Sequence, residues 1–316
     1  MPRRVEFDIA KALCIILVVM GHYTTTNPTW WANVRDIIYT FHMPLFMFAS
    51  GYIYIAFKKE ECYGSFLQKK IKRLMIPYVV TSIIIIAIKL LTQSILYVKN
   101  PVTPFAFLKI FYYPEAAYHL WFIWALWWIF CIVPFFKSKK WRTILFGVSI
   151  LLHYMQPHLV LPSIACIDST VKMLMWFMIG VMCFDWNVDI KNVKLTHIGL
   201  TAVIFATALI MKERGILFHH LCPYLGVIFF MYLSKWISEK RTHKTLMAVS
   251  KSSYIIYLFH STFMGFTLSI LMKLSFMHSL PLLTLIIIVA TGVIIPILLQ
   301  YLLLRTKTTR FLFGLK

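Results

Sequence analysis

Long apolar runs recur along nearly the whole chain, separated by short polar and basic segments. A helix needs about 20 apolar residues to cross the hydrocarbon core of a bilayer. Runs of that kind lie near residues 9–26, 37–57, 74–97, 119–136, 142–159, 170–186, 195–211, 216–236, 253–272 and 281–304. The pattern therefore predicts an all-α, polytopic membrane helix bundle of about ten transmembrane helices, which fills residues 1–316 as a single domain.

Composition excludes the main soluble classes of protein. Of the 316 residues, 60% are hydrophobic and only 14% are charged. These values exclude a disordered chain, a disulfide-stapled secreted module and an ordinary cytosolic enzyme. The first run follows Arg3 and Arg4 as in a signal peptide. Since no small-x-small cleavage site follows it, we expect this run to be retained.

The charge distribution predicts an orientation. Lys and Arg total 32 against 11 Asp and Glu, for a net charge of +21. Most of these cations fall on alternate flanks of the ten runs, as expected for cytoplasmic loops when both termini are cytoplasmic. We expect a multi-pass protein of the plasma (cytoplasmic) membrane. Nucleic acid is not an expected partner, because the apolar runs leave no soluble face for a duplex.

Ionisable side chains at membrane depth are costly and indicate a lined cavity. Asp8 and His22 share one face of the first run but lie about 21 Å apart along its axis, so they do not form an acid–base dyad. An ion-paired or capping Asp8 and a structural His22 bonded to a carbonyl remain open. His42 stands at the outer end of the second run, and Pro44 frees a backbone carbonyl beside it.

Two later runs also carry polar stripes. Glu115 and His119 are four residues apart and are expected on one helix face. Tyr257 and His260 lie on one stripe of the ninth run. Stripes that converge inside a bundle indicate a binding chamber. Ser50 in the second run is a candidate nucleophile, although no base stands beside it at helical spacing.

The loop after the second run is dense in cations, among them Lys70, Lys72 and Arg73. Anionic lipid headgroups would attract such a loop without any further function. A phosphate-rich cytosolic ligand is the other interpretation, with Arg73 forming a bidentate contact and the lysines acting as point charges.

Six short stretches follow one another in a specific order. They are Arg4-x-x-x-Asp8; Val18-Val19-Met20-Gly21-His22; Phe41-His42-Met43-Pro44-Leu45-Phe46 with Ser50-Gly51-Tyr52; Lys70-Ile71-Lys72-Arg73-Leu74 through Pro77-Tyr78; His119-Leu120-Trp121-Phe122; and Ser250-x-x-Ser253-Tyr254-x-x-Tyr257-x-x-His260. In this order the sequence resembles membrane acyltransferase family 3, whose members acylate sugars of surface polysaccharides and related molecules.

The resemblance implies transfer of an acyl group, usually acetyl, from cytosolic acetyl-CoA to a hydroxyl group of a glycan or a lipid-linked sugar, with no metal. The family's functional histidine maps to His22, and Glu115 and Asp8 complete the candidate catalytic set. The family's basic pair maps to Lys70 and Arg73, with Lys72 between them, although the family favours arginine at both positions. The remaining candidates are expected to orient substrate or hold the chamber together: His42, Ser50, His119, Tyr257 and His260.

A transporter or flippase for a polysaccharide precursor is the main alternative, because broken helices and polar residues at mid-membrane also suit a carrier. Against a carrier, no inverted repeat relates the two halves. The cationic loop also suits a CoA better than a translocating sugar. Membrane lipid is an expected partner in either case.

Overall fold

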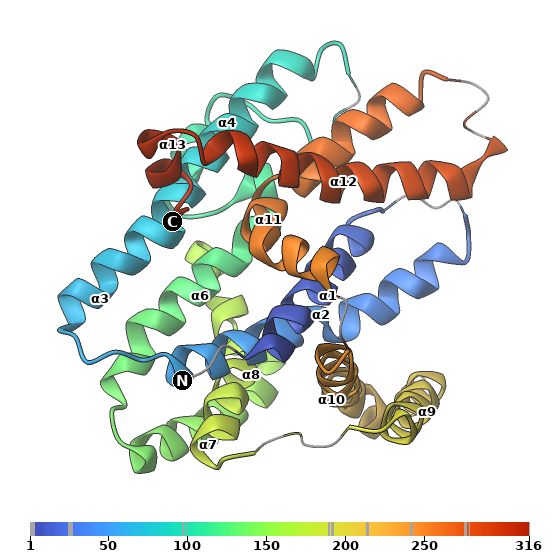
Figure 1. Cartoon of the computed structure of the whole chain (residues 1–316). Helices are drawn as coiled ribbons and strands as arrows, with labels where there is room; N and C mark the ends of the chain where they lie inside the picture. Colours follow the sequence, from blue (N-terminus) through green and yellow to red (C-terminus); the bar gives the residue numbers. More distant parts are fainter. Residues whose placement is uncertain are drawn as a thin grey trace. The chain divides into compact units, whose positions relative to one another are not determined.

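The structure is a computed structural model that describes residues 4–24, 28–96, 98, 100–188, 190, 193–212, 215–240, 243–274, 277 and 279–315. Arg3 lies outside this set. Every regular element among these residues is a helix, as Figure 1 shows. The all-α prediction is confirmed.

Six helical segments within the described residues are long and apolar enough to cross a membrane. They are Tyr63–Thr92, Ala117–Phe135, Ile164–Asp185, Ile216–Ser238, Lys244–Leu271 and Pro281–Leu303. Leu195–Met211 is a shorter apolar helix. The chain is therefore a multi-pass membrane protein, whereas the count of ten spans and the cytoplasmic termini stay predictions.

The chain divides into two compact units, and each is described separately. The first unit comprises residues 1–58 and 176–257, and the second comprises residues 59–175 and 258–316. Two helices, α8 (Ile167–Asp185) and α11 (Lys244–Leu271), contribute residues to both units. The single-domain expectation stays a prediction.

The first unit is built around three helices that pack pairwise: α1 (Val5–Gly21), α2 (Trp31–Ala56) and α10 (Ile216–Ser238). Helix α9 (Leu195–Met211) packs along α10 (Figure 1). Where α2 meets α8, glycine is required on both sides. A Cβ added at Gly51 would lie 1.9 Å from the Phe177 carbonyl oxygen, and one at Gly180 would lie 2.0 Å from that of Phe48. The backbones of α2 and α8 therefore approach each other closely at these two glycines.

The ends of α1 and α2 differ from the predicted spans. Helix α1 ends at Gly21, so His22 is its C-terminal cap rather than a residue deep within a span. Helix α2 begins at Trp31, six residues before the predicted run, so His42 lies inside the helix and not at its end. The buried Trp31 indole donates to the Tyr23 carbonyl at 2.9 Å, which closes the connection between the two helices. Hydropathy alone underestimates the length of α2, because the first turns of this helix carry Arg35 and Asp36.

The second unit contains the remaining elements. Its helices are α3 (Tyr63–Lys70), the π-helix η1 (Ile71–Met75), α4 (Ile76–Thr92), α5 (Ala106–Lys109), η2 (Glu115–Leu120), α6 (Trp121–Ile132), η3 (Val133–Phe135), α7 (Lys139–Met155), η4 (Gln156–His158), η5 (Ile164–Cys166), α12 (Pro281–Leu303) and α13 (Lys307–Leu312). Proline stands in the first turn of α12, where its missing N–H costs nothing.

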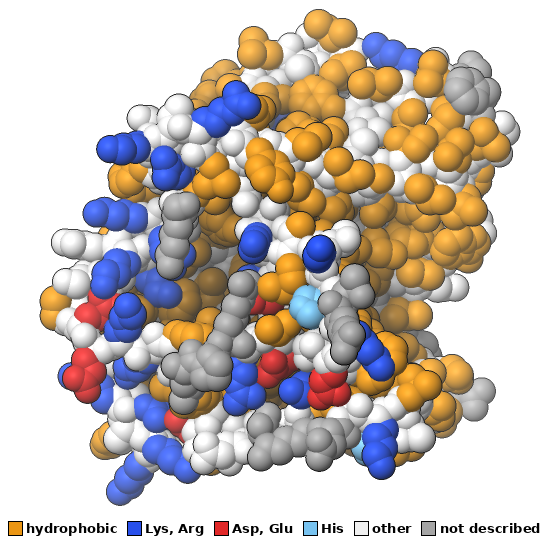
Figure 2. Space-filling model, viewed as in Figure 1, with side chains coloured by type: hydrophobic (Ala, Val, Ile, Leu, Met, Phe, Trp, Pro, Cys, Tyr) orange, Lys and Arg blue, Asp and Glu red, His pale blue; other side chains and the backbone are white. Residues whose placement is uncertain are grey.

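The surface of this unit fits a membrane protein. Large apolar side chains such as Leu282, Ile286 and Leu298 are exposed along α12, and orange side chains cover that region in Figure 2. Lys and Arg side chains gather over α3 in the same view. Because a soluble protein seldom exposes so large an apolar face, α12 is suited to contact lipid.

Candidate active site

His22 is half-buried at the carbonyl end of α1. Its Nδ1 lies 2.8 Å from the carbonyl oxygen of Val18, one turn earlier. A carbonyl oxygen only accepts, so Nδ1 carries the hydrogen in this bond, and in the neutral ring the lone pair is on Nε2. This tautomer is the one that a proton-accepting Nε2 requires.

His42 repeats this arrangement on α2. Its Nδ1 lies 2.7 Å from the Ile38 carbonyl oxygen, again one turn earlier, and the side chain is only 2% exposed. The His42 carbonyl in turn accepts from the Cys14 thiol on α1, with Sγ and O 2.9 Å apart. The second histidine is therefore fixed both to its own helix and to α1.

Tyr39 links the two histidines, and it was not among the residues that the sequence pattern singled out. Its ring centroid lies 5.1 Å from that of His42, edge to face, and 6.4 Å from that of His22. Tyr39 also covers Gly21, where an added Cβ would meet its ring at an ordinary 3.7 Å. The signal that would have found it is its position three residues before His42, on the same helix face.

Asp8 is at the other end of α1 and is ion-paired. Its Oδ1 lies 3.4 Å from Lys11 Nζ and accepts from the Ser250 hydroxyl of α11 at 3.2 Å. The carboxylate thus joins α1 to α11 within the first unit. Ser50 donates to the Phe46 carbonyl at 2.8 Å, a bond that serines inside helices often make. Tyr257 is buried on α11.

The cationic residues of the second unit lie on a distorted helix. Lys72 and Arg73 are exposed on the π-helix η1, an irregularity that is frequent at functional sites. Lys70 is placed differently: its Nζ lies 3.6 Å above the Phe130 ring centroid and 5.1 Å from that of Phe66. The ammonium of Lys70 is therefore held by two aromatic rings of its own unit.

Glu115 is exposed and bonded to Lys109, with Oε2 and Nζ 2.7 Å apart. This hydrogen bond raises the pKa of Lys109. The expectation that Glu115 and His119 share a helix face is wrong, because Ala117 between them has non-helical φ and ψ of −144° and 65°. Spacing of four residues places side chains together only in a continuous α-helix.

His119 instead contacts His260 on α11. Their ring centroids lie 4.9 Å apart, nearly edge to face, and His260 is fully buried. His119 Nε2 is 3.4 Å from the Leu258 carbonyl oxygen, a long bond to the same helix. These two candidates, 141 residues apart in the chain, are brought together within the second unit.

Comparison with known protein families matches residues 4–301 to the acyltransferase domain. The chain belongs to acyltransferase family 3. Two relatives of this chain are nodulation proteins NolL. That of Mesorhizobium japonicum is 28% identical over 137 residues, which cover 39% of this chain and 33% of the relative. That of Sinorhizobium fredii is 46% identical over 57 residues, 16% of either chain. The match thus spans a third or less of these relatives, and no solved structure matches.

In this chain the candidate residues form separate groups. His22 and His42 flank Tyr39, and Asp8 lies at the far end of α1 from His22. His119 and His260 form a second pair. The roles of all these residues in acyl transfer stay predictions.

Proposed function

We propose that this acyltransferase moves an acyl group, acetyl in the first instance, from cytosolic acyl-CoA to a hydroxyl group of a cell-surface glycan or its lipid-linked precursor. The family assignment supports acyl transfer. The ordered motifs that resemble those of the family support the sugar acceptor, the CoA donor and the plasma membrane location.

The observation that carries the mechanism is the hydrogen bond from His22 Nδ1 to the Val18 carbonyl. It leaves Nε2 as the basic atom of the neutral ring. His22 also caps the carbonyl end of α1, where the helix dipole stabilises the positive charge that forms when the ring accepts a proton. A histidine in this state suits general-base catalysis.

In the proposed reaction, Nε2 takes the proton of the acceptor hydroxyl as the hydroxyl oxygen attacks the thioester carbonyl carbon. The new C–O bond forms, the C–S bond breaks, and the proton passes from the imidazolium to the departing thiolate. Tyr39 and His42, beside His22, orient the acceptor. On the donor side, the exposed Lys72 and Arg73 bind the phosphates of the CoA, and Arg73 provides the bidentate contact.

The test is transfer of labelled acetyl from acetyl-CoA to isolated surface glycans by the purified protein. His22→Ala should lower kcat by about 10²-fold or more, the contribution typical of a general base. His153→Ala is the matched control, because its Nδ1 also bonds a backbone carbonyl, that of Lys172, at 2.7 Å. This control should retain full activity.

Two results would overturn the proposal. One is an unchanged rate in His22→Ala. The other is glycan flux across vesicles without any ester formed, which would identify the protein as a carrier. Comparison of surface glycans from cells with and without the gene, searched for one missing ester, would identify the acceptor.

A further inference from the structure

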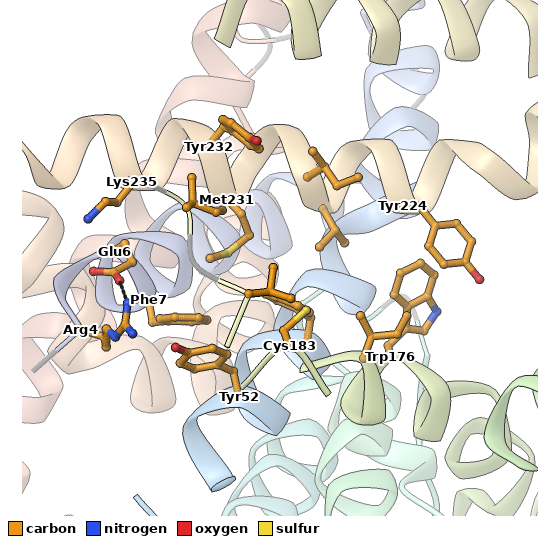
Figure 3. Close-up of a pocket in the computed structure, with 16 residues that line it drawn as sticks. Arg4, Glu6, Phe7, Tyr52, Trp176, Cys183, Tyr224, Met231, Tyr232 and Lys235 are labelled. Atoms are coloured by element: carbon orange, nitrogen blue, oxygen red, sulfur yellow. Dashed lines mark hydrogen bonds and ion pairs between the residues drawn. The ribbon is translucent and has the colours of Figure 1, made fainter. Parts of the chain in front are cut away.

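The first unit contains a pocket of about 430 Å³ that includes none of the candidate catalytic residues. Helices α1, α2, α8 and α10 line it, and Figure 3 shows their side chains. Phe7 lies 15 residues before His22 on α1, or about 22 Å at the rise of an α-helix. The pocket is therefore distinct from the His22 region, and its ligand can be inferred independently of the proposed function.

The walls of the pocket are apolar. Phe7 and Tyr52 stack with ring centroids 4.2 Å apart on one side, and Val227, Met231 and Ile179 contribute aliphatic surface. A pocket of this volume lies within the range of about 300–1,000 Å³ that small-molecule sites occupy. A ligand that fills this pocket must therefore bury a hydrocarbon group against these walls.

Charged groups gather at one end only. Arg4, Glu6 and Lys235 lie together at one end in Figure 3, and Trp176 and Tyr224 lie at the other. Arg4 and Glu6 form an ion pair at 3.2 Å. The charged end therefore offers cations and a carboxylate side by side, which complements a ligand group carrying both phosphate and ammonium.

The length of the pocket matches one lipid chain. Tyr224 and Lys235 are 11 residues apart on α10, about 16 Å along its axis. One leaflet of a hydrocarbon core about 30 Å thick is about 15 Å deep. A chain anchored at Lys235 thus reaches the Trp176–Tyr224 pair, whose ring centroids lie 4.5 Å apart, at the depth where a phospholipid chain ends.

We infer that this pocket binds one acyl chain of a zwitterionic phospholipid of the phosphatidylethanolamine type. The phosphate accepts hydrogen bonds from Arg4 and Lys235, and the ammonium pairs with Glu6. The chain runs along α10 to Trp176 and Tyr224. Such a lipid fills the space among α1, α2, α8 and α10 and binds these helices together.

The experiment uses the whole protein in vesicles that contain phosphatidylethanolamine with a diazirine at the end of one acyl chain. After illumination, labelled peptides are identified by mass spectrometry. Label should concentrate on the peptides carrying Trp176 and Tyr224. Ile228→Trp, at a pocket residue that is 44% exposed, should lower this labelling about tenfold or more, as expected from losing the burial of a few methylene groups.

Leu221→Trp is the matched control, since Leu221 lies on α10, is 39% exposed and does not line the pocket. The Leu221→Trp protein should be labelled to the same extent as the wild type.

A phosphatidylglycerol probe with the same diazirine should label the protein less than the phosphatidylethanolamine probe does. Glu6→Gln should abolish that difference, because the ammonium group loses its partner. If the label is spread evenly over exposed helix faces, or if Ile228→Trp leaves the labelling unchanged, the assignment of a lipid chain to this pocket is overturned. Equal labelling by both probes in the wild type would overturn the headgroup assignment.

Discussion

His22 and His42 show how a local hydrogen bond fixes the tautomer of a neutral histidine. Each ring donates from Nδ1 to the carbonyl one turn earlier, and each therefore presents Nε2 in its neutral form. The sequence pattern identified both histidines, because polar residues inside apolar runs are costly. It did not identify Tyr39, whose proposed role depends on its contact with His22 at the end of another helix.

A substitution at Tyr39 can distinguish the proposed orientation of the acceptor by His22, Tyr39 and His42 from the packing of their rings. Tyr39→Phe keeps the ring that contacts His22 and His42 but removes the hydroxyl. If the hydroxyl orients the acceptor, Tyr39→Phe should raise the KM for the acceptor several-fold, with the KM for acyl-CoA and the thermal midpoint unchanged. This several-fold rise in KM corresponds to the loss of one hydrogen bond, about 0.5–1.5 kcal/mol. Steady-state kinetics with each substrate varied in turn will distinguish the outcomes, and an equal rise of both KM values would contradict the assignment.

Lys70 makes a structural contact, whereas its neighbours Lys72 and Arg73 are exposed. Because its ammonium lies above Phe130, Lys70→Ala should lower stability by about 0.5–2 kcal/mol through loss of the cation–π contact. Lys70→Arg should restore it, since arginine makes the same contact. Lys72→Ala should leave stability unchanged and instead raise the KM for acyl-CoA. Thermal unfolding in detergent measures the stability of each variant, and steady-state kinetics with acyl-CoA varied measures its KM for the donor. Equal stability of the Lys70→Ala and Lys72→Ala variants would contradict this division of roles.

The contact between α2 and α8 depends on two glycines rather than on large apolar side chains. Gly51→Ala would place its Cβ against the Phe177 carbonyl, so the helices must separate and the packing of the first unit must loosen. We expect a loss of about 1–3 kcal/mol, the usual cost of overpacking. The measurement is the thermal midpoint in detergent.

Gly147→Ala provides the control for this substitution. Gly147 also lies inside a helix, α7, but an added Cβ there meets nothing within 4 Å. It should be neutral or slightly stabilising, because alanine favours the helix more than glycine does. A Gly51→Ala protein as stable as Gly147→Ala would contradict the close contact.

The elements were more predictable from the sequence than their ends or their irregular parts. Apolar runs predicted the long helices of both units but not the short ones α3, α5 and α13. Helix α2 begins before its run because polar residues occupy its first turns. The π-helix at Ile71–Met75 and the kink at Ala117 have no signature in hydropathy, because both are backbone irregularities. For this reason the neighbours of Glu115 could not be predicted, and Lys109 rather than His119 is its partner.

For the molecule as a whole, the orientation in the membrane is a prediction from the charges of the loops, and Cys62 offers a way to test it. All six cysteines lie in the described part of the chain, and Cys62 is the exposed one. It precedes α3, in a loop that the distribution of Lys and Arg predicts to be cytoplasmic. The hydroxyl of Ser65, 3.1 Å from Sγ, and the Ser65 backbone lower the pKa of the Cys62 thiol. A lowered pKa means more thiolate at a given pH, and the thiolate is the form that reacts.

A membrane-impermeant maleimide should therefore label Cys62 in inverted membrane vesicles and leave it unlabelled in intact cells. The rate should rise with pH to a plateau set by the lowered pKa, and Ser65→Ala should move this rise to higher pH because the hydroxyl no longer stabilises the thiolate. Cys62→Ser, which removes the exposed thiol, should abolish labelling, since the other cysteines are buried or half-buried. Labelling of equal speed in intact cells would place this loop outside the cell. The two predicted spans before this loop would then run in the opposite direction, and Lys72 and Arg73 just beyond the loop would not face the compartment that contains acyl-CoA.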